Sequence, residues 1–116
     1  MPVRMRRTEF AELVGDALDA IPAEFTEAMT NVVVVIEPRH PAEPGILGLY
    51  HGVALTERTH DYAGVLPDTI TIYREPILAM CDTREQVARE VAVTVTHEIA
   101  HHFGIDDDWL HAHGWG

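Results

Sequence analysis

Two histidines and a glutamate near the end of the chain form the pattern His97-Glu98-Ile99-Ala100-His101. In an α-helix, residues four apart lie only about 40° apart around the axis, so both imidazoles can reach one metal ion. Glu98 lies beside the pair, where its carboxylate can contact a water on that metal but is poorly placed as a third ligand. This combination predicts a zinc-dependent hydrolase in which Glu98 is the general base.

The pattern continues beyond the second histidine to Gly104 and Asp107. A catalytic zinc needs three protein ligands and one open position. Gly104 can take a positive φ and turn the chain back toward the metal, so that a residue three positions later can complete the ligand set. We expect Asp107 to be the third ligand, with Asp108 as the nearest competitor. His111, His113 and residues upstream stay open as alternatives.

A long helix over residues 83–103 is predicted to carry this pattern. Thr83 and Gln86 form a capping box at its start, and Gly104 follows its end. No glycine or proline lies between them. His102 falls among the apolar positions of this helix, and we expect it to be a half-buried, hydrogen-bonded packing residue rather than a ligand.

The rest of the chain is predicted to supply two helices and three strands. The helices cover residues 8–20, with Thr8 as a plausible N-cap, and a short stretch after Pro22. The strands are a buried one at 32–36, an irregular one at 46–55 and an alternating one at 69–73. Because helices and strands do not alternate along the chain, we predict a single α+β domain over residues 1–116.

The composition narrows the range of partners. The 116 residues include eight basic side chains, all arginine, against nineteen acidic ones, for a net charge of −11. This balance disfavours nucleic acid and anionic membrane surfaces as partners. The longest aliphatic run, Val32–Ile36, is too short to cross a bilayer, and the first residues do not resemble a secretory signal. We therefore expect a cytoplasmic protein, of an oligomeric state that the sequence does not indicate.

The stretch HEIAHHFGIDDDWL resembles the signature of the small zincin-like metallopeptidases, of the aspartate-zincin kind with H-E-x-x-H-x-x-G-x-x-D. LGLYHGVALTER and LPDTITIYREPI also look like upstream segments of that family. The resemblance implies a minimal zincin-like fold, in which a short three-stranded sheet packs on a long C-terminal metal-bearing helix. It also implies His97, His101 and Asp107 as Zn²⁺ ligands and Glu98 as the catalytic carboxylate. We expect no counterpart in this sequence of the lower subdomain of larger aspartate zincins or of the methionine turn of metzincins.

The leading hypothesis is a zinc metallopeptidase that cleaves peptides or an extended protein segment. One alternative is a zinc-binding interaction module without proteolytic activity, motivated by the missing lower subdomain. A small metal-dependent endoribonuclease is a second alternative, which the acidic charge disfavours.

A peptidase also needs a donor for the oxyanion besides zinc. The candidates are Tyr50, His51, Tyr73 and His111, and the sequence does not rank them. Tyr50 and His51 also lie in a segment that could be an exposed edge strand, to which an extended peptide could pair.

Overall fold

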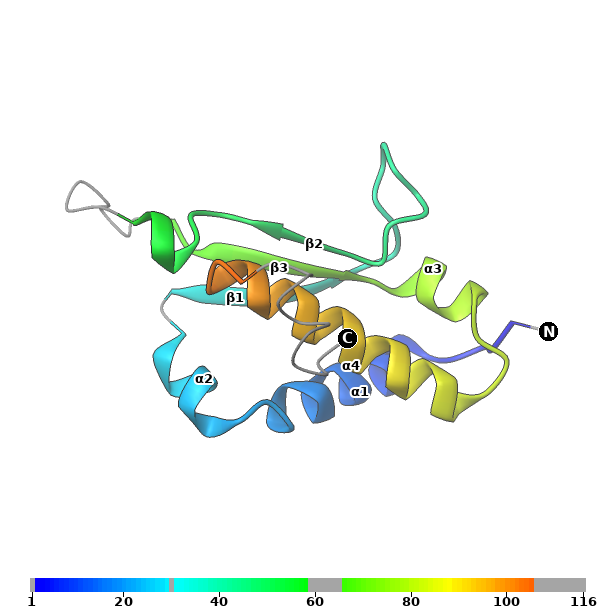
Figure 1. Ribbon diagram of the computed structural model, residues 1–116. Helices are drawn as coiled ribbons and strands as arrows, with labels where there is room; N and C mark the ends of the chain where they lie inside the picture. The colour runs from blue at the N-terminus through cyan, green and yellow to red at the C-terminus, as the bar shows by residue number, and fades with distance from the viewer. Residues whose placement is uncertain (1, 30, 59–65, 106–116) are drawn as a thin grey trace.

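The computed structural model describes residues 2–29, 31–58 and 66–105 of the chain. A small sheet forms one layer, and α1, α2 and α4 lie together on one of its faces (Figure 1). The predicted α+β class is confirmed. In chain order the elements are α1 (Arg7–Asp19), α2 (Ala23–Ala28), β1 (Val32–Glu37), β2 (Gly48–His51), the 3₁₀ turn η1 (Leu55–Glu57), β3 (Asp68–Tyr73), α3 (Arg74–Ala79) and α4 (Arg84–His102).

The sheet has three strands in the order β1-β3-β2. β1 runs parallel to the central strand β3, with Val34 opposite Ile70. β2 runs antiparallel to β3 and places Tyr50 opposite the same residue. Ile70 and Ile72 of β3 have no exposed surface, as their alternation with threonines predicts. Among the described strands β2 is therefore an edge strand, and its outer edge lies on the side of the sheet away from β1.

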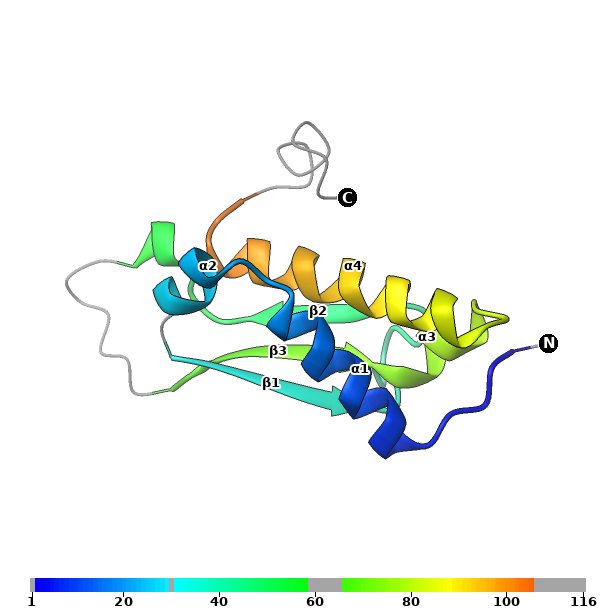
Figure 2. The ribbon, with the colours of Figure 1, turned by 90° about the horizontal axis from the view of Figure 1, so that it is seen from below.

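The helix α4 packs against α1 and against β2 and β3, and runs alongside β2 (Figure 2). Its apolar positions recur every four residues, which places them on one side of the helix. They meet apolar residues of α1 and β3, and the resulting core comprises Phe10, Leu13, Val14, Ile70, Ile72, Val87, Val91, Val95 and Ile99, each at most 9% exposed.

Both ends of α4 carry the capping features that the sequence predicts. At its start the backbone N–H of Gln86 donates to the Thr83 hydroxyl, and the side-chain oxygen of Gln86 accepts from the backbone N–H of Thr83. The predicted capping box is therefore present. At its end Gly104 has φ +75°, and Ile105 N–H donates to the Ala100 carbonyl over 2.8 Å. This is the Schellman arrangement, in which glycine relieves the steric cost of the left-handed turn.

Three local expectations need correction. α1 begins at Arg7, with Arg6 as its N-cap and no capping side chain, so Thr8 lies inside the helix and is not its cap. β1 is not fully buried: because helices cover only one face of the sheet, Val33 on the other face is 43% exposed. The irregular strand is short, since β2 ends at His51 before Gly52, whose φ is +156°. Within the described residues, no helix is long and apolar enough to cross a membrane.

Candidate metal centre

The last two turns of α4 carry the residues that the sequence selects for metal chemistry. His97 is half-buried, and Glu98 is 8% exposed. The side chain of His101 is 46% exposed, and its Nδ1 lies 3.2 Å from Oε1 of Glu98. The structure thus brings the predicted base into direct contact with one of the two predicted ligands.

The carboxylate of Glu98 lies against the backbone of β2. A Cβ atom built on Gly48 would be 2.7 Å from Cγ2 of Thr94, and 3.2 Å and 3.3 Å from Cγ and Oε2 of Glu98. Real Cβ atoms essentially never come within 2.7 Å of another atom, so the missing side chain at position 48 is what allows α4 to approach this strand. Glu98 therefore lies under the edge strand, between the sheet and the solvent-exposed His101.

The donor set on α4 suits zinc. Neutral imidazoles and carboxylates are ordinary ligands of this ion, and two histidines one helical turn apart are a common half of its site. The Nε2 atom of His97, one of these potential donors, is buried. No group of three or more histidine, cysteine or acidic side chains that could hold a metal occurs within residues 2–29, 31–58 and 66–105.

The predicted third ligand falls outside the described part of the chain. Asp107 lies there, together with its competitor Asp108 and the alternatives His111 and His113. Their assignment stays a prediction from the motif. Gly104, which precedes them, does take the turn on which that prediction depends.

An open hollow of about 380 Å³ lies directly beside His101. Residues from β2, from the loop through η1 and from the end of α4 line it. These are Tyr50, Gly52, Ala54, Glu57, His101, Gly104 and Ile105. Ala54 and Ile105 give it apolar surface, and Glu57 contributes the one carboxylate among these lining residues. Its volume is in the range of hollows that bind small ligands or single side chains.

Of the candidate oxyanion donors in the described residues, only Tyr50 lies at this site. It alternates with His51 along β2, so His51 points to the face of the sheet opposite α4. Tyr73 lies at the other end of β3, where its ring packs edge-on to His40. Burial, with the nearby charge of Glu37, raises the pKa of Tyr73 against the lowering effect of a hydrogen bond from Thr71. His51 and Tyr73 are therefore not placed to contact a substrate at His101.

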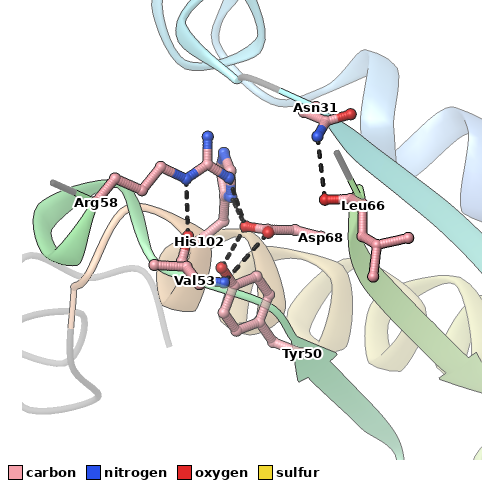
Figure 3. Close-up of polar contacts among 7 residues, drawn as sticks. All are labelled: Asn31, Tyr50, Val53, Arg58, Leu66, Asp68 and His102. Atoms are coloured by element: carbon pink, nitrogen blue, oxygen red, sulfur yellow. Dashed lines mark hydrogen bonds and ion pairs between the residues drawn. The ribbon is translucent and has the colours of Figure 1, made fainter. Parts of the chain in front are cut away.

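Asp68 is a buried acid beside the site that the sequence did not single out. It opens β3, is 2% exposed, and accepts hydrogen bonds from Tyr50, Arg58 and His102 (Figure 3). Burial alone raises the pKa of Asp68, but the hydrogen bonds from these groups and from Val53 N–H outweigh it and leave the pKa below its ordinary value. His102, expected to be half-buried, is fully buried and hydrogen-bonded.

An α+β domain whose long helix carries His-Glu-x-x-His beneath an edge strand defines the zincin-like class that the motif predicts. A model of the zincin-like metallopeptidase family matches residues 29–115. The chain belongs to that family.

The named relatives of this chain are zinc metalloproteinases, as the family predicts, but their sequence identity to it is low. A zinc metalloproteinase/disintegrin of Gloydius halys is 32% identical over 90 residues, and one of Craspedocephalus gramineus is 33% identical over 90 residues. Each comparison covers 66% of this chain but only 19% and 21% of the relative, so the chain spans about a fifth of their length.

A solved structure shares the fold. A conserved hypothetical protein of T. thermophilus superimposes with a TM-score of 0.58 at 23% identity, over 85% of this chain and 94% of the other. The family implies a metal-dependent, peptidase-like domain, whereas this structural likeness shows the fold alone.

Proposed function

We propose that this chain is a zinc-dependent metallopeptidase domain in which Glu98 is the general base. The observation that carries the proposal is the position of its carboxylate, buried under β2 and 3.2 Å from the His101 ring. A carboxylate in contact with a proposed metal ligand, which itself lines an open hollow, supports this role, because a general base must lie within reach of the reacting water.

His97, His101 and Asp107 would hold the Zn²⁺ ion, with Asp108 as the alternative to Asp107. When bound, zinc would polarise the peptide carbonyl and make an attacking water more acidic. Glu98 takes a proton from that water as its oxygen bonds to the carbonyl carbon. The C–N bond then breaks, and the leaving amine departs with the proton that Glu98 returns to it.

The substrate we propose is an extended peptide that lies along β2. This strand pairs with β3 on one side only, within the part of the chain that the structure describes. Its other edge can accept a further strand through main-chain hydrogen bonds, which is a common mode of peptide recognition. A peptide bound there would run past Glu98 and place a side chain in the hollow beside His101.

The decisive experiment compares the parent with Glu98→Gln in digestion of a peptide library after zinc loading. We expect the variant to retain zinc and to lose at least about a hundredfold in turnover, because glutamine keeps the shape but cannot accept the proton. Equal cleavage by both proteins would refute the role of Glu98. A zinc-loaded parent that cleaves no peptide would instead favour a zinc-binding interaction module.

The third ligand is tested by metal analysis of Asp107→Ala and Asp108→Ala. We expect Asp107→Ala to lose bound zinc and Asp108→Ala to retain it. The reverse result would assign the ligand to Asp108.

A further inference from the structure

Asp68 joins three separate parts of the chain through one buried carboxylate. Its Oδ2 atom accepts from the Tyr50 hydroxyl at 2.5 Å, from Arg58 at 2.8 Å and from Nδ1 of His102 at 2.9 Å. Its Oδ1 atom accepts from Val53 N–H at 3.2 Å. These donors come from β2, from the loop around η1 and from the last turn of α4 (Figure 3).

The same three parts form the walls of the hollow at the metal centre. Tyr50, Gly52 and Ala54 line it from β2 and the following loop, and His101 and Gly104 line it from α4. Asp68 is not one of the lining residues and is buried behind them. Of its partners, Tyr50 lines the hollow itself, and Val53, Arg58 and His102 are each next in the chain to a lining residue.

Contacts lead from this carboxylate to the predicted ligand His101 by two routes. His102 is the next residue in the chain, and its ring is fully buried against Asp68. The Tyr50 ring, fixed by its hydroxyl, packs edge-on to His101 with ring centroids 6.3 Å apart, and to His102 at 6.1 Å. Asp68 is therefore linked to the ring of His101 through Tyr50, and to its backbone through His102.

The loop after β2 is shaped to reach Asp68. A Cβ atom at Gly52 would lie 2.3 Å from Oδ1 of Asp68, so only glycine allows this approach. Arg58 bonds Asp68 and also donates from Nε to the Val53 carbonyl over 2.9 Å, which closes the loop around the carboxylate. The charges of Asp68 and Arg58 balance, as a buried ion pair requires.

We infer that Asp68 is a positioning residue of the metal centre, and that it sets the zinc affinity without touching metal or substrate. The inference rests on the proposed function for its metal. Residues that hold the metal ligands in place commonly influence metal affinity, because they fix the orientation of the ligands before the ion binds. Here the carboxylate orients His101 through its two neighbours and holds the end of α4, from which the chain continues toward the predicted third ligand.

The test uses Asp68→Asn and, as a matched control, Glu9→Gln. Both substitutions remove one carboxylate that pairs with an arginine, but Glu9 bonds Arg84 at the opposite end of α4, over 2.9 Å. An amide at position 68 would present N–H donors to groups that are themselves donors. We expect the folded Asp68→Asn protein to bind zinc about tenfold more weakly than the parent, and Glu9→Gln to bind it as tightly as the parent.

A second measurement separates positioning from a loss of overall stability. Amide hydrogen exchange in the metal-free proteins should be faster for residues 100–105 in Asp68→Asn and unchanged at the start of α4. Parent-like zinc affinity and parent-like exchange in folded Asp68→Asn would overturn the inference. Uniformly faster exchange along the whole chain, with unchanged affinity, would also overturn it, since it would indicate a structural role only.

Tyr50→Phe provides the test if Asp68→Asn does not fold. It removes a single hydrogen bond to Asp68 and keeps the ring beside His101. We expect a severalfold loss of zinc affinity, and affinity equal to that of the parent would contradict the inference. Should the parent bind no zinc at all, the proposed function fails, and the exchange measurement alone then decides whether Asp68 holds the end of α4.

Discussion

The two ends of α4 are held in place by different means. At the start, Thr83 and Gln86 satisfy the free backbone groups locally, and the pair of Arg84 with Glu9 of α1 is exposed to solvent. At the end, His102 is fully buried and bonded to Asp68, 34 residues away. The start is capped by neighbouring residues and joined to α1 only through an exposed ion pair, whereas the end that carries the metal motif has a buried bond to the sheet.

This difference has a physical reason. A helix cap needs only to satisfy backbone groups, and a short sequence can do that. A metal centre needs its ligands fixed to within fractions of an ångström, which requires contacts from several elements. The buried polar network lies at the end of α4 that carries the motif, where the proposed metal centre would need such contacts.

The largest effect on stability is expected from Asp68→Ala. The substitution removes the carboxylate that accepts hydrogen bonds from the side chains of Arg58 and His102. Breaking a buried ion pair by removing one partner costs about 3–5 kcal/mol. Denaturant unfolding measures the change. The exposed counterpart Glu9→Gln should cost under about 1 kcal/mol, because solvent screens that pair. Equal costs at the two ends would contradict the comparison.

Acid should weaken the same contacts. Because the folded pKa of Asp68 lies below its ordinary value, its contribution to stability is fully present above about pH 4 and is lost as the pH falls through the folded pKa. Among residues 2–29, 31–58 and 66–105, the charged and titratable groups that bond it are Tyr50, Arg58 and His102. The free energy of unfolding, measured below about pH 4, should decline more steeply for the parent than for Asp68→Asn. Parallel curves for the two proteins would exclude this role.

Gly104→Ala should have an intermediate effect. Its φ of +75° disfavours any side chain, and a Cβ would lie 2.1 Å from Oγ1 of Thr56. We expect a loss of about 1–3 kcal/mol in thermal or denaturant unfolding. Gly15, inside α1, has no atom within 4 Å of a built Cβ, so Gly15→Ala is the control and should be neutral or stabilising. A neutral Gly104→Ala would show that the turn does not need glycine.

The smallest effect is expected at the opposite end, from Thr83→Ala. This change removes the hydroxyl that accepts from Gln86 N–H over 3.1 Å, and the loss of such a cap costs about 1 kcal/mol. Zinc affinity should stay that of the parent, since the cap lies at the far end of the helix from His101. A change in zinc affinity would show that the two ends are coupled.

Much of the fold could be predicted because its signals are local. The cap at Thr83, the turn at Gly104 and the alternation of Ile70 and Ile72 each depend on neighbouring residues, and each is confirmed. The prediction of Thr8 as the N-cap is wrong, because α1 already begins at Arg7. The free backbone N–H groups at the start of this helix have no capping side chain.

The polar network could not be predicted, because no local pattern links its members. The position of His102 among apolar residues indicated that it needed a hydrogen-bond partner, but the sequence did not name one. Arg58, Asp68 and His102 come together only when the sheet and α4 pack. The assignment of His97, Glu98, His101 and Asp107 to metal chemistry stays a prediction from the motif and the family.

The central claim is that His97 and His101 share one zinc ion at the end of α4. The most direct test is the zinc content of the purified protein after dialysis. The proteins to compare are the parent, His97→Asn, His101→Asn and the control His40→Asn, whose ring lies beside Tyr73 at the other end of the sheet. We predict one zinc per chain in the parent and in the control, and almost none in the other two variants. Full occupancy in His97→Asn and His101→Asn, or none in the parent, would contradict the account.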